Sequence, residues 1–348
     1  MRKNGFIFRL FITSLCAAYF FAILGPEKLK TEATANDLVG EGKGECVMEM
    51  NSRRVLYQSH GDIRLPMAST TKILTCITVL ENSNLQEEVI IPQDAVGIEG
   101  SSVYLKEGEK YTVEDLLYGL MLRSGNDCAV ALALHCSKSI EKFCTLMNET
   151  AQKAGALESH FSNPHGLSDP THYTTAYDLS LITAYAMQNV VFREIVSTQY
   201  YETKHWKNKN KMLTLYEGGI GVKTGYTKIA GRCLVSAAER NGMTVICVVL
   251  NCPNTYERSI SLLDDAFESY EYVPLLKASQ PLEIGKTGVK ARVDRDYFYP
   301  LLEEEKALIE IKTEEIVKRD KQKTAQVIGK FEILLSKRLL FSGNLYKL

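Results

Sequence analysis

The sequence predicts an α+β fold, in which an antiparallel sheet packs with helices and a small β-rich domain follows. Three observations support this prediction: strand-like patterns near the start, a long and mainly helical stretch over residues 81–215, and a return to strand-like patterns after residue 220. The chain has 348 residues, and 45% of them are hydrophobic, which is enough for a sizeable core. Its 41 basic and 42 acidic residues nearly cancel, which argues against a generally basic nucleic-acid binder.

The first half of the chain begins with two short strands, predicted over residues 46–50 and 53–58 around the turn Asn51-Ser52. Pro66 is expected to open a helix, whose apolar body spans residues 73–80. Thr112 resembles a helix cap, and residues 129–135 form another apolar helical pattern. Residues 161–177 are rich in Pro, Gly, Asp and Thr, and they predict a loop.

The second half predicts strands over residues 221–227, 232–239 and 244–250, with the hairpin signal Asn241-Gly242 between the last two. A final helix is expected over residues 262–270. Short strand patterns then recur at residues 289–293, 307–311 and 331–335. We therefore expect a main domain over residues 36–275 and a small β-rich domain over residues 276–348.

The N-terminus has the composition of an export signal. Arg2, Lys3 and Arg9 precede or flank an apolar run over residues 10–24, and residues 33–35 form an A-x-A cleavage candidate. An uncleaved membrane anchor is the alternative for residues 1–35. Either interpretation predicts that the protein is exported, with possible membrane contact through the N-terminus only.

The nine cysteines include no C-x-x-C pair, so zinc ribbons and thioredoxin-like motifs are not supported. Most of them lie in apolar runs and are expected to be buried thiols, although disulfides remain possible. The histidines match no metal-binding pattern, and no metal or cofactor is predicted.

Ser69-Thr70-Thr71-Lys72 is an S-x-x-K motif at the predicted start of a helix. Residues i and i+3 share a helix face, so the hydroxyl and the amine can meet. An apolar helix body behind Lys72 would desolvate the amine and lower its pKa, which would make it a general base for Ser69. A second match, Ser139 to Lys142, has a polar setting and is interpreted as an ordinary helix start.

Two further motifs follow in the chain. Ser124-Gly125-Asn126 is an S-x-N in a predicted interhelical loop, and Lys223-Thr224-Gly225 is a K-T-G in a predicted edge strand, where Gly225 lets a ligand approach the backbone. Each also has a second copy, at residues 342–344 and 286–288, and the latter is interpreted as a turn.

In this order, the three motifs are the signature of penicillin-binding proteins and class A β-lactamases. Together with the flanking residues 66–73, 162–167 and 221–227, they make the chain resemble the D-alanyl-D-alanine carboxypeptidases, which are low-molecular-mass penicillin-binding proteins. The resemblance covers about residues 44–275. It implies a β-lactamase/transpeptidase-like fold, and a serine peptidase that removes the terminal D-alanine from peptidoglycan stem pentapeptides and is acylated by penicillin.

The resemblance also implies roles for the matching residues. Ser69 would attack the penultimate D-Ala carbonyl, Lys72 would take its proton, and Ser124 would pass a proton to the leaving amine. Substrate binding is implied for Asn126, Lys223, Thr224, Gly225 and Tyr226, with Arg258 as an additional carboxylate partner or else a solvated cation at a helix start. The backbone N–H groups of Ser69 and Tyr226 would form an oxyanion hole.

Two alternatives remain open at this point. A β-lactamase would share the acylation step, but it usually needs an E-x-x-L-N element, and no such string lies between Asn126 and Lys223. A penicillin-binding but non-hydrolytic wall-scaffold module would belong to another class. Transpeptidase or endopeptidase activity is also compatible with the motifs. The C-terminal residues 331–348 predict short strands rather than the membrane-lying helix that ends many relatives.

Overall fold

The structure, a computed structural model, describes residues 41–285, 288–316 and 327–348. The predicted export signal and Lys286 and Thr287 of the second K-T-G lie outside these residues. Within them, no helix is both long and apolar enough to cross a bilayer.

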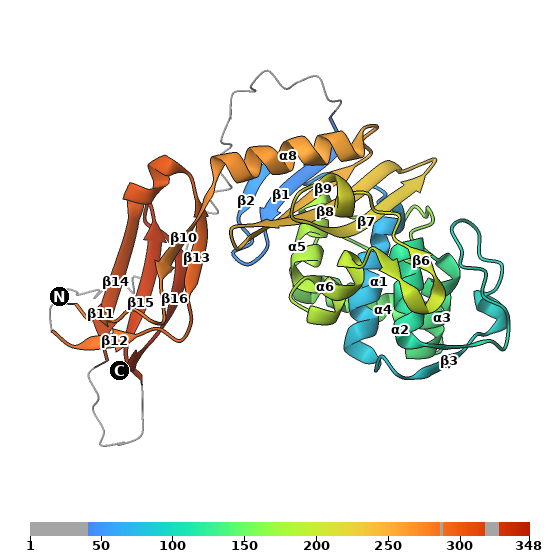
Figure 1. Cartoon of the computed structure of the whole chain (residues 1–348), viewed down its shortest axis with the longest axis horizontal. Coiled ribbons are helices and arrows are strands. Elements are labelled where there is room, and N and C mark those ends of the chain that lie inside the picture. Colours follow the sequence, from blue (N-terminus) through green and yellow to red (C-terminus); the bar gives the residue numbers. More distant parts are fainter. Residues whose placement is uncertain (1–40, 286–287, 317–326) are drawn as a thin grey trace, which may run out of the picture. The chain divides into compact units, whose positions relative to one another are not determined.

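A five-stranded antiparallel sheet in the order β2-β1-β9-β8-β7 is the centre of the main part of the chain (Figure 1). Its strands are β1 (Gly44–Glu49), β2 (Val55–Ser59), β7 (Gly219–Thr227), β8 (Gly231–Arg240) and β9 (Met243–Leu250). Strand β7 lies at one edge of the sheet, and no other strand of the described residues pairs with its outer side. The predicted Asn241-Gly242 hairpin joins β8 and β9, and both turn residues have positive φ, as a type I′ turn requires.

Each face of this sheet carries its own apolar cluster. One face packs against α8 (Thr255–Ser269), through odd-numbered β1 and β9 residues such as Val47 and Val249. The other face supplies even-numbered residues such as Met48 and Val248 to the larger cluster with the helices of residues 72–197, and Figure 1 shows these helices on the side opposite α8. The alternation of strand side chains therefore separates the two cores.

The helical region lies between β2 and β7 in the chain, as predicted. It contains α1 (Lys72–Asn82), α2 (Val113–Tyr118), α3 (Asn126–Ser137), α4 (Ile140–Ala154), α5 (Ala176–Ala186), α6 (Val190–Ser197) and α7 (Met212–Leu215). Two small strand pairs interrupt it: β3 (Glu88–Ile90) with β4 (Lys110–Thr112), and β5 (Tyr200–Tyr201) with β6 (Trp206–Lys207). Strands of two or three residues are too short to show an alternating pattern in the sequence.

Helix caps explain several of these boundaries. The Thr112 side chain accepts from Asp115 N–H at 3.0 Å, which confirms the predicted cap before α2. Ser139 caps α4, so the second S-x-x-K is a helix start, as expected. Helix α1, however, begins at Lys72 and not near Pro66, because residues Ala68–Thr71 form the separate 3-10 turn η1. Helix α8 begins at Thr255, seven residues before the predicted start at residue 262.

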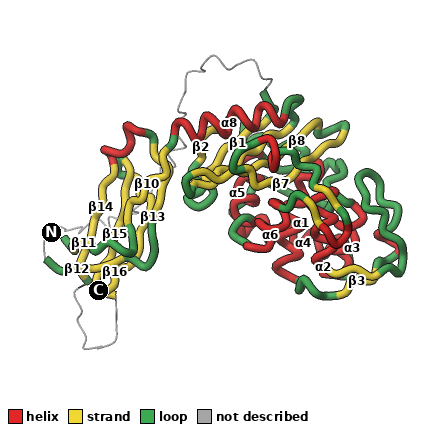
Figure 2. The backbone as a smooth tube through the Cα atoms, in the orientation of Figure 1, coloured by secondary structure: helices red, strands yellow, loops and turns green. Residues whose placement is uncertain are grey.

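The C-terminal part forms a second five-stranded sheet in the order β11-β12-β16-β15-β14 (Figure 2). Its strands are β11 (Leu282–Glu283), β12 (Lys290–Arg292), β14 (Ile309–Glu315), β15 (Val327–Leu335) and β16 (Arg338–Lys347), and β10 (Glu271–Leu276) pairs with β13 (Tyr297–Leu301). The prediction of strands near the C-terminus is confirmed, whereas the domain boundaries remain a prediction.

One C-terminal expectation is wrong in part. Residues Glu303–Leu308 form a 3-10 helix, so the predicted strand over residues 307–311 begins only at Ile309. The Glu305 side chain accepts from Leu302 N–H at 2.9 Å, and acidic residues in the first turn favour a helical start.

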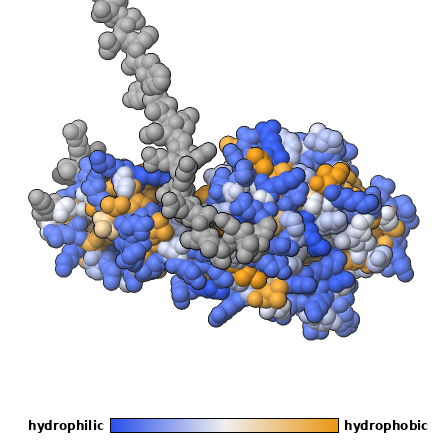
Figure 3. Space-filling model, turned by 90° about the horizontal axis from the view of Figure 1, so that it is seen from above, coloured by the Kyte–Doolittle hydropathy of each residue, from blue (hydrophilic) through white to orange (hydrophobic). Residues whose placement is uncertain are grey.

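The cysteine side chains lie mostly in the protein interior, and the surface is mainly polar. The eight described cysteines are free, and all except Cys136 are buried, as the sequence predicted. On the face drawn in Figure 3, hydrophobic residues gather in separate patches on a mainly hydrophilic surface.

Candidate active site

The nucleophile candidate Ser69 and the base candidate Lys72 lie where a 3-10 turn passes into a helix. Ser69 belongs to η1, and Lys72 is the first residue of α1. The Lys72 Nζ atom lies 3.0 Å from Ser69 Oγ, although Lys72 itself is fully buried. The S-x-x-K motif therefore brings the two side chains together, as its spacing predicted.

Two further acceptors hold the Lys72 amine. Nζ donates to Asn126 Oδ1 at 2.7 Å and to the His165 carbonyl oxygen at 2.5 Å. Both groups can only accept, so the two N–H bonds of a neutral amine satisfy them and the lone pair is left for the Ser69 hydroxyl. This arrangement is suited to a general base.

Burial and charge both favour the neutral amine. Burial lowers the pKa of Lys72 well below its ordinary value, and the nearby Lys223 ammonium lowers the pKa further. Burial also lowers the pKa of Lys223, to about 7, with a smaller contribution from Lys209. Of the three neighbouring lysines, Lys209 is the exposed one.

The S-x-N motif lies beside this pair. Ser124 is buried and has a left-handed backbone, with φ of 64°, at the end of the π-helical turn Gly119–Arg123. Asn126 begins α3, and its Nδ2 donates to the Glu99 carbonyl at 2.5 Å. The structure thus fixes Asn126 against Lys72, and its predicted contact with a substrate amide stays a prediction.

The K-T-G motif lies on the edge strand β7, directly against the serine turn. A Cβ atom added to Gly225 would lie 3.0 Å from the Met67 carbonyl oxygen and 3.1 Å from Ser69 N. Only glycine allows this close approach without displacing the turn. Lys223 is buried and donates to the Thr224 carbonyl at 3.0 Å, whereas Tyr226 is 64% exposed.

A buried hydrogen-bond chain supports the serine turn from behind. Ala68, just before the nucleophile, has φ of 50°, and its carbonyl accepts from Thr71 Oγ1 at 2.8 Å. Thr71 Oγ1 also lies 2.8 Å from His172 Nε2, and His172 Nδ1 accepts from Ser162 N–H at 3.1 Å. Because Nδ1 accepts, Nε2 carries the proton and donates to Thr71, which in turn donates to Ala68.

Two supporting residues were not assigned a role from the sequence. The Asp127 carboxylate accepts from Ser102 Oγ at 2.5 Å and from Val103 N–H at 3.0 Å, which fixes the loop before the S-x-N turn. His165 contributes through its backbone carbonyl, and the residue type gives no indication of such a role. Asp127 directly follows the S-x-N motif, and this position could have indicated its supporting role.

Arg258 does not join this cluster, and its assignment to the site is wrong. It lies on α8, on the opposite face of the sheet, where it is buried. Its guanidinium donates to both carboxylate oxygens of Glu45, at 2.9 and 2.7 Å, and to Tyr57 Oη. The alternative of a solvated cation is also wrong, because this bidentate ion pair neutralises the guanidinium inside the protein.

Comparison with known proteins agrees with the motifs. The family profile described as D-alanyl-D-alanine carboxypeptidase matches residues 31–254. The chain belongs to this family. The match confirms the prediction of a serine-type D-alanyl-D-alanine carboxypeptidase, and neither the β-lactamase nor the non-hydrolytic scaffold is favoured.

Individual relatives cover most of the chain. The D-alanyl-D-alanine carboxypeptidase DacF of Bacillus subtilis is 33% identical over 270 residues, which are 73% of this chain and 69% of that protein. A D-alanyl-D-alanine carboxypeptidase of a Streptomyces species is 38% identical over 231 residues, 60% of this chain and 79% of that one. The solved penicillin-binding protein 5 of Haemophilus influenzae has a TM-score of 0.72 at 28% identity, covering 88% of this chain and 96% of the other. This likeness confirms the predicted fold class.

Proposed function

We propose that the enzyme removes the terminal D-alanine of peptidoglycan stem pentapeptides through an acyl-enzyme on Ser69. The neutral Lys72 amine takes the Ser69 proton as the hydroxyl oxygen attacks the penultimate D-Ala carbonyl. The C–N bond then breaks, and Ser124 passes a proton to the departing D-alanine amine. Water hydrolyses the resulting Ser69 ester and regenerates the hydroxyl.

The edge strand β7 supplies the groups that orient the substrate in this proposal. The backbone N–H groups of Ser69 and Tyr226 stabilise the developing oxyanion. Lys223 keeps the site electropositive, and Thr224 binds the terminal carboxylate. Gly225 keeps the strand close to the serine turn, so that both oxyanion-hole donors can reach the same oxygen.

The 3.0 Å contact between Lys72 Nζ and Ser69 Oγ, with the amine buried and its other acceptors satisfied, carries the proposal. The same pairing accounts for acylation by β-lactams, which present a strained amide carbonyl to the same hydroxyl.

The test is D-alanine release from a stem pentapeptide, combined with intact-mass measurement after penicillin treatment and mapping of the adduct. We expect one penicilloyl adduct on the peptide containing Ser69, and loss of both adduct and D-alanine release in Ser69→Ala. Ser139→Ala, in the second S-x-x-K, is the matched control and should retain both. Labelling at another serine, or D-alanine release by Ser69→Ala, would contradict the proposal.

The fate of the acyl-enzyme distinguishes the remaining activities. Rapid penicillin turnover would instead indicate a β-lactamase. A solved structure 35% identical to this chain is described as a DD-transpeptidase, so an added amine acceptor should be included in the assay. Transfer of the acyl group to that amine would add transpeptidation to hydrolysis.

We also propose that the protein works outside the cytoplasmic membrane. Its proposed substrate lies there, and the basic and apolar N-terminal segment is typical of an export signal. Fractionation of cells expressing the full chain, with N-terminal sequencing of the product, would test both export and cleavage after Ala35.

A further inference from the structure

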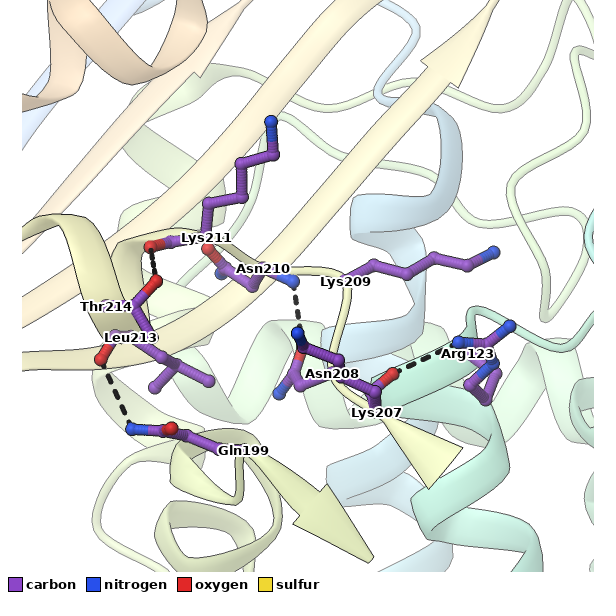
Figure 4. Close-up of a pocket in the computed structure, with 9 residues that line it drawn as sticks. All are labelled: Arg123, Gln199, Lys207, Asn208, Lys209, Asn210, Lys211, Leu213 and Thr214. Carbon is purple, nitrogen blue, oxygen red and sulfur yellow. Dashed lines mark hydrogen bonds between the residues drawn. The ribbon is translucent and has the colours of Figure 1, made fainter. Parts of the chain in front are cut away.

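A cationic pocket lies next to the catalytic groups and has no role in the proposed reaction. It has a volume of about 380 Å³ and is lined by the nine residues drawn in Figure 4. Four of them are cations (Arg123, Lys207, Lys209 and Lys211), and none of the described residues that line the pocket is Asp or Glu. No salt bridge within the described ranges involves these four side chains.

The pocket wall carries uncompensated positive charge and one buried donor, Asn210 Nδ2, that has no acceptor in the described structure. Figure 4 shows the charged ends of Lys209 and Arg123 on the same side of the view, whereas Lys211 extends away from them. Partial desolvation of its side chain and the Arg123 charge lower the pKa of Lys209, as expected for two cations that no anion compensates. Asn210 is 5% exposed, and its Nδ2 has no hydrogen-bond partner in the described structure, while its Oδ1 accepts from Met212 N–H.

Backbone contacts place this pocket beside Ser124. Lys209 N–H donates to the Leu122 carbonyl at 3.2 Å, and Arg123 Nη1 donates to the Lys207 carbonyl at 3.2 Å. The charge of Lys209 also contributes to the lowered pKa values of Lys72 and Lys223. The pocket and the catalytic lysines therefore share one electrostatic environment.

The direction in which the substrate lies along β7 determines which end of it faces the pocket. This direction rests on the proposed function. The scissile carbonyl lies at Tyr226 and the terminal carboxylate at Thr224 and Lys223, so the substrate ends toward lower residue numbers. Residues 219–222 extend past that end. Gly221 approaches the Val196 carbonyl there, which also accepts from the pocket residue Asn208 at 3.4 Å.

We propose that this pocket binds a second carboxylate, carried by the leaving group beyond the terminal carboxylate of D-alanine. D-Alanine has one carboxylate, which Thr224 and Lys223 already take, so the pocket is unused when D-alanine leaves. Two leaving groups have the required chemistry: an acidic D-amino acid at the end of the stem, and a second stem peptide attached through a cross-link. Hydrolysis follows the same acyl-enzyme route, with the larger amine as the leaving group.

The test compares two isosteric substrates, stem peptides ending in D-Ala–D-Glu and in D-Ala–D-Gln, which differ only in the second carboxylate. We expect kcat/KM to favour D-Glu by about tenfold, as for one partly solvated charge-assisted hydrogen bond. The preference should fall with added salt. Lys209→Met and Arg123→Met should reduce it toward unity, and Lys209→Arg should retain it.

The ratio of kcat/KM for the D-Glu substrate to kcat/KM for the D-Gln substrate cancels any effect of these variants on the acylation step, because both substrates share that step. Lys142→Met, at an exposed lysine of α4 that does not line the pocket, is the charge-matched control and should leave the ratio unchanged. Two outcomes would overturn the inference. One is equal kcat/KM values for D-Glu and D-Gln together with cross-link cleavage that Lys209→Met slows no more than D-alanine release, and the other is a D-Glu preference that survives Lys209→Met. A fall of both substrates together would assign the pocket to the terminal carboxylate instead, and would overturn it as well.

A cross-linked pair of stem peptides forms the second arm. Cleavage that Lys209→Met slows more than D-alanine release identifies the attached stem as the source of the carboxylate, and a preference confined to D-Glu identifies the acidic terminal residue. Normal D-alanine release, with neither a D-Glu preference nor a cross-link cleavage that depends on Lys209, refutes this inference alone. Absence of D-alanine release refutes the proposed function.

Discussion

Protonation of His172 should loosen the turn that carries Ser69. In the folded protein His172 accepts from Ser162 N–H through Nδ1 and donates to Thr71 through Nε2, so a second proton would face a donor. Burial lowers the pKa of His172 from 6.5 to about 4, and the nearby Asp169 opposes this only in part. The folded state therefore binds fewer protons than the unfolded chain between these two pH values.

The sign and size of the effect follow from this difference. Because the folded pKa is depressed, the stabilisation is present above about pH 6.5 and is lost as the pH falls toward 4. A shift of this size lowers the free energy of unfolding by about 2 kcal/mol between pH 7.5 and pH 5. That is a large part of the stability of a typical domain.

The assay is urea denaturation of the wild type and of His172→Gln at several pH values. Glutamine can still donate to Thr71 and accept from Ser162, but it does not titrate, so the variant should lack this part of the pH dependence. The difference between the two proteins isolates His172 from the other titrating groups. A difference that stays constant from pH 7.5 to pH 5 would refute the reasoning.

Three further substitutions test the packing of the site, its charge and the buried ion pair on the opposite face of the sheet. Gly225→Ala should slow penicillin acylation more than tenfold with little change in Tm, because the added methyl group would meet Ser69 N at 3.1 Å. An unchanged acylation rate would contradict the close packing of β7 against the serine turn. Substrate KM should rise as the pH increases through about 7, because Lys223 loses its proton and no longer attracts the substrate carboxylate. Lys223→Arg should abolish this rise, since arginine stays charged. A wild-type KM independent of pH would argue against a substrate carboxylate at Lys223. Arg258→Met should lower the free energy of unfolding by about 3 to 5 kcal/mol, because it leaves the Glu45 carboxylate buried and unpaired; a changed KM in the folded variant would restore Arg258 to the substrate site.

Local patterns predicted the parts of the fold that depend on neighbouring residues. The β8–β9 hairpin followed from Asn241-Gly242 between two apolar runs, and the α2 cap followed from Thr112. The start of α1 was placed too early, because Pro66 was interpreted as the first helical residue. Residues Ala68–Thr71 instead form a 3-10 turn, which differs from an α-helix in the carbonyl that each N–H contacts, and the sequence does not show this difference. The β3–β4 pair was missed because its strands are too short to alternate.

The site shows the same limit at longer range. The three motifs predicted the contact of Ser69 with Lys72, since both residues lie within one turn. The Arg258 error came from a property that no local pattern contains, namely which face of the sheet α8 covers. The His165 carbonyl and the His172–Thr71 chain depend on a loop that lies 93 to 101 residues later in the sequence than the groups it contacts, so only the structure reveals them.

The position of β7 at the open edge of its sheet has a consequence for recognition. An unpaired edge can accept an incoming extended peptide as one more strand, and most of the attraction then comes from main-chain groups that every peptide shares. Main-chain pairing of this kind depends little on the side chains of the bound peptide. Specificity must therefore come from recognition of the peptide's terminal residue, which suits an enzyme that removes residues from one end of a chain.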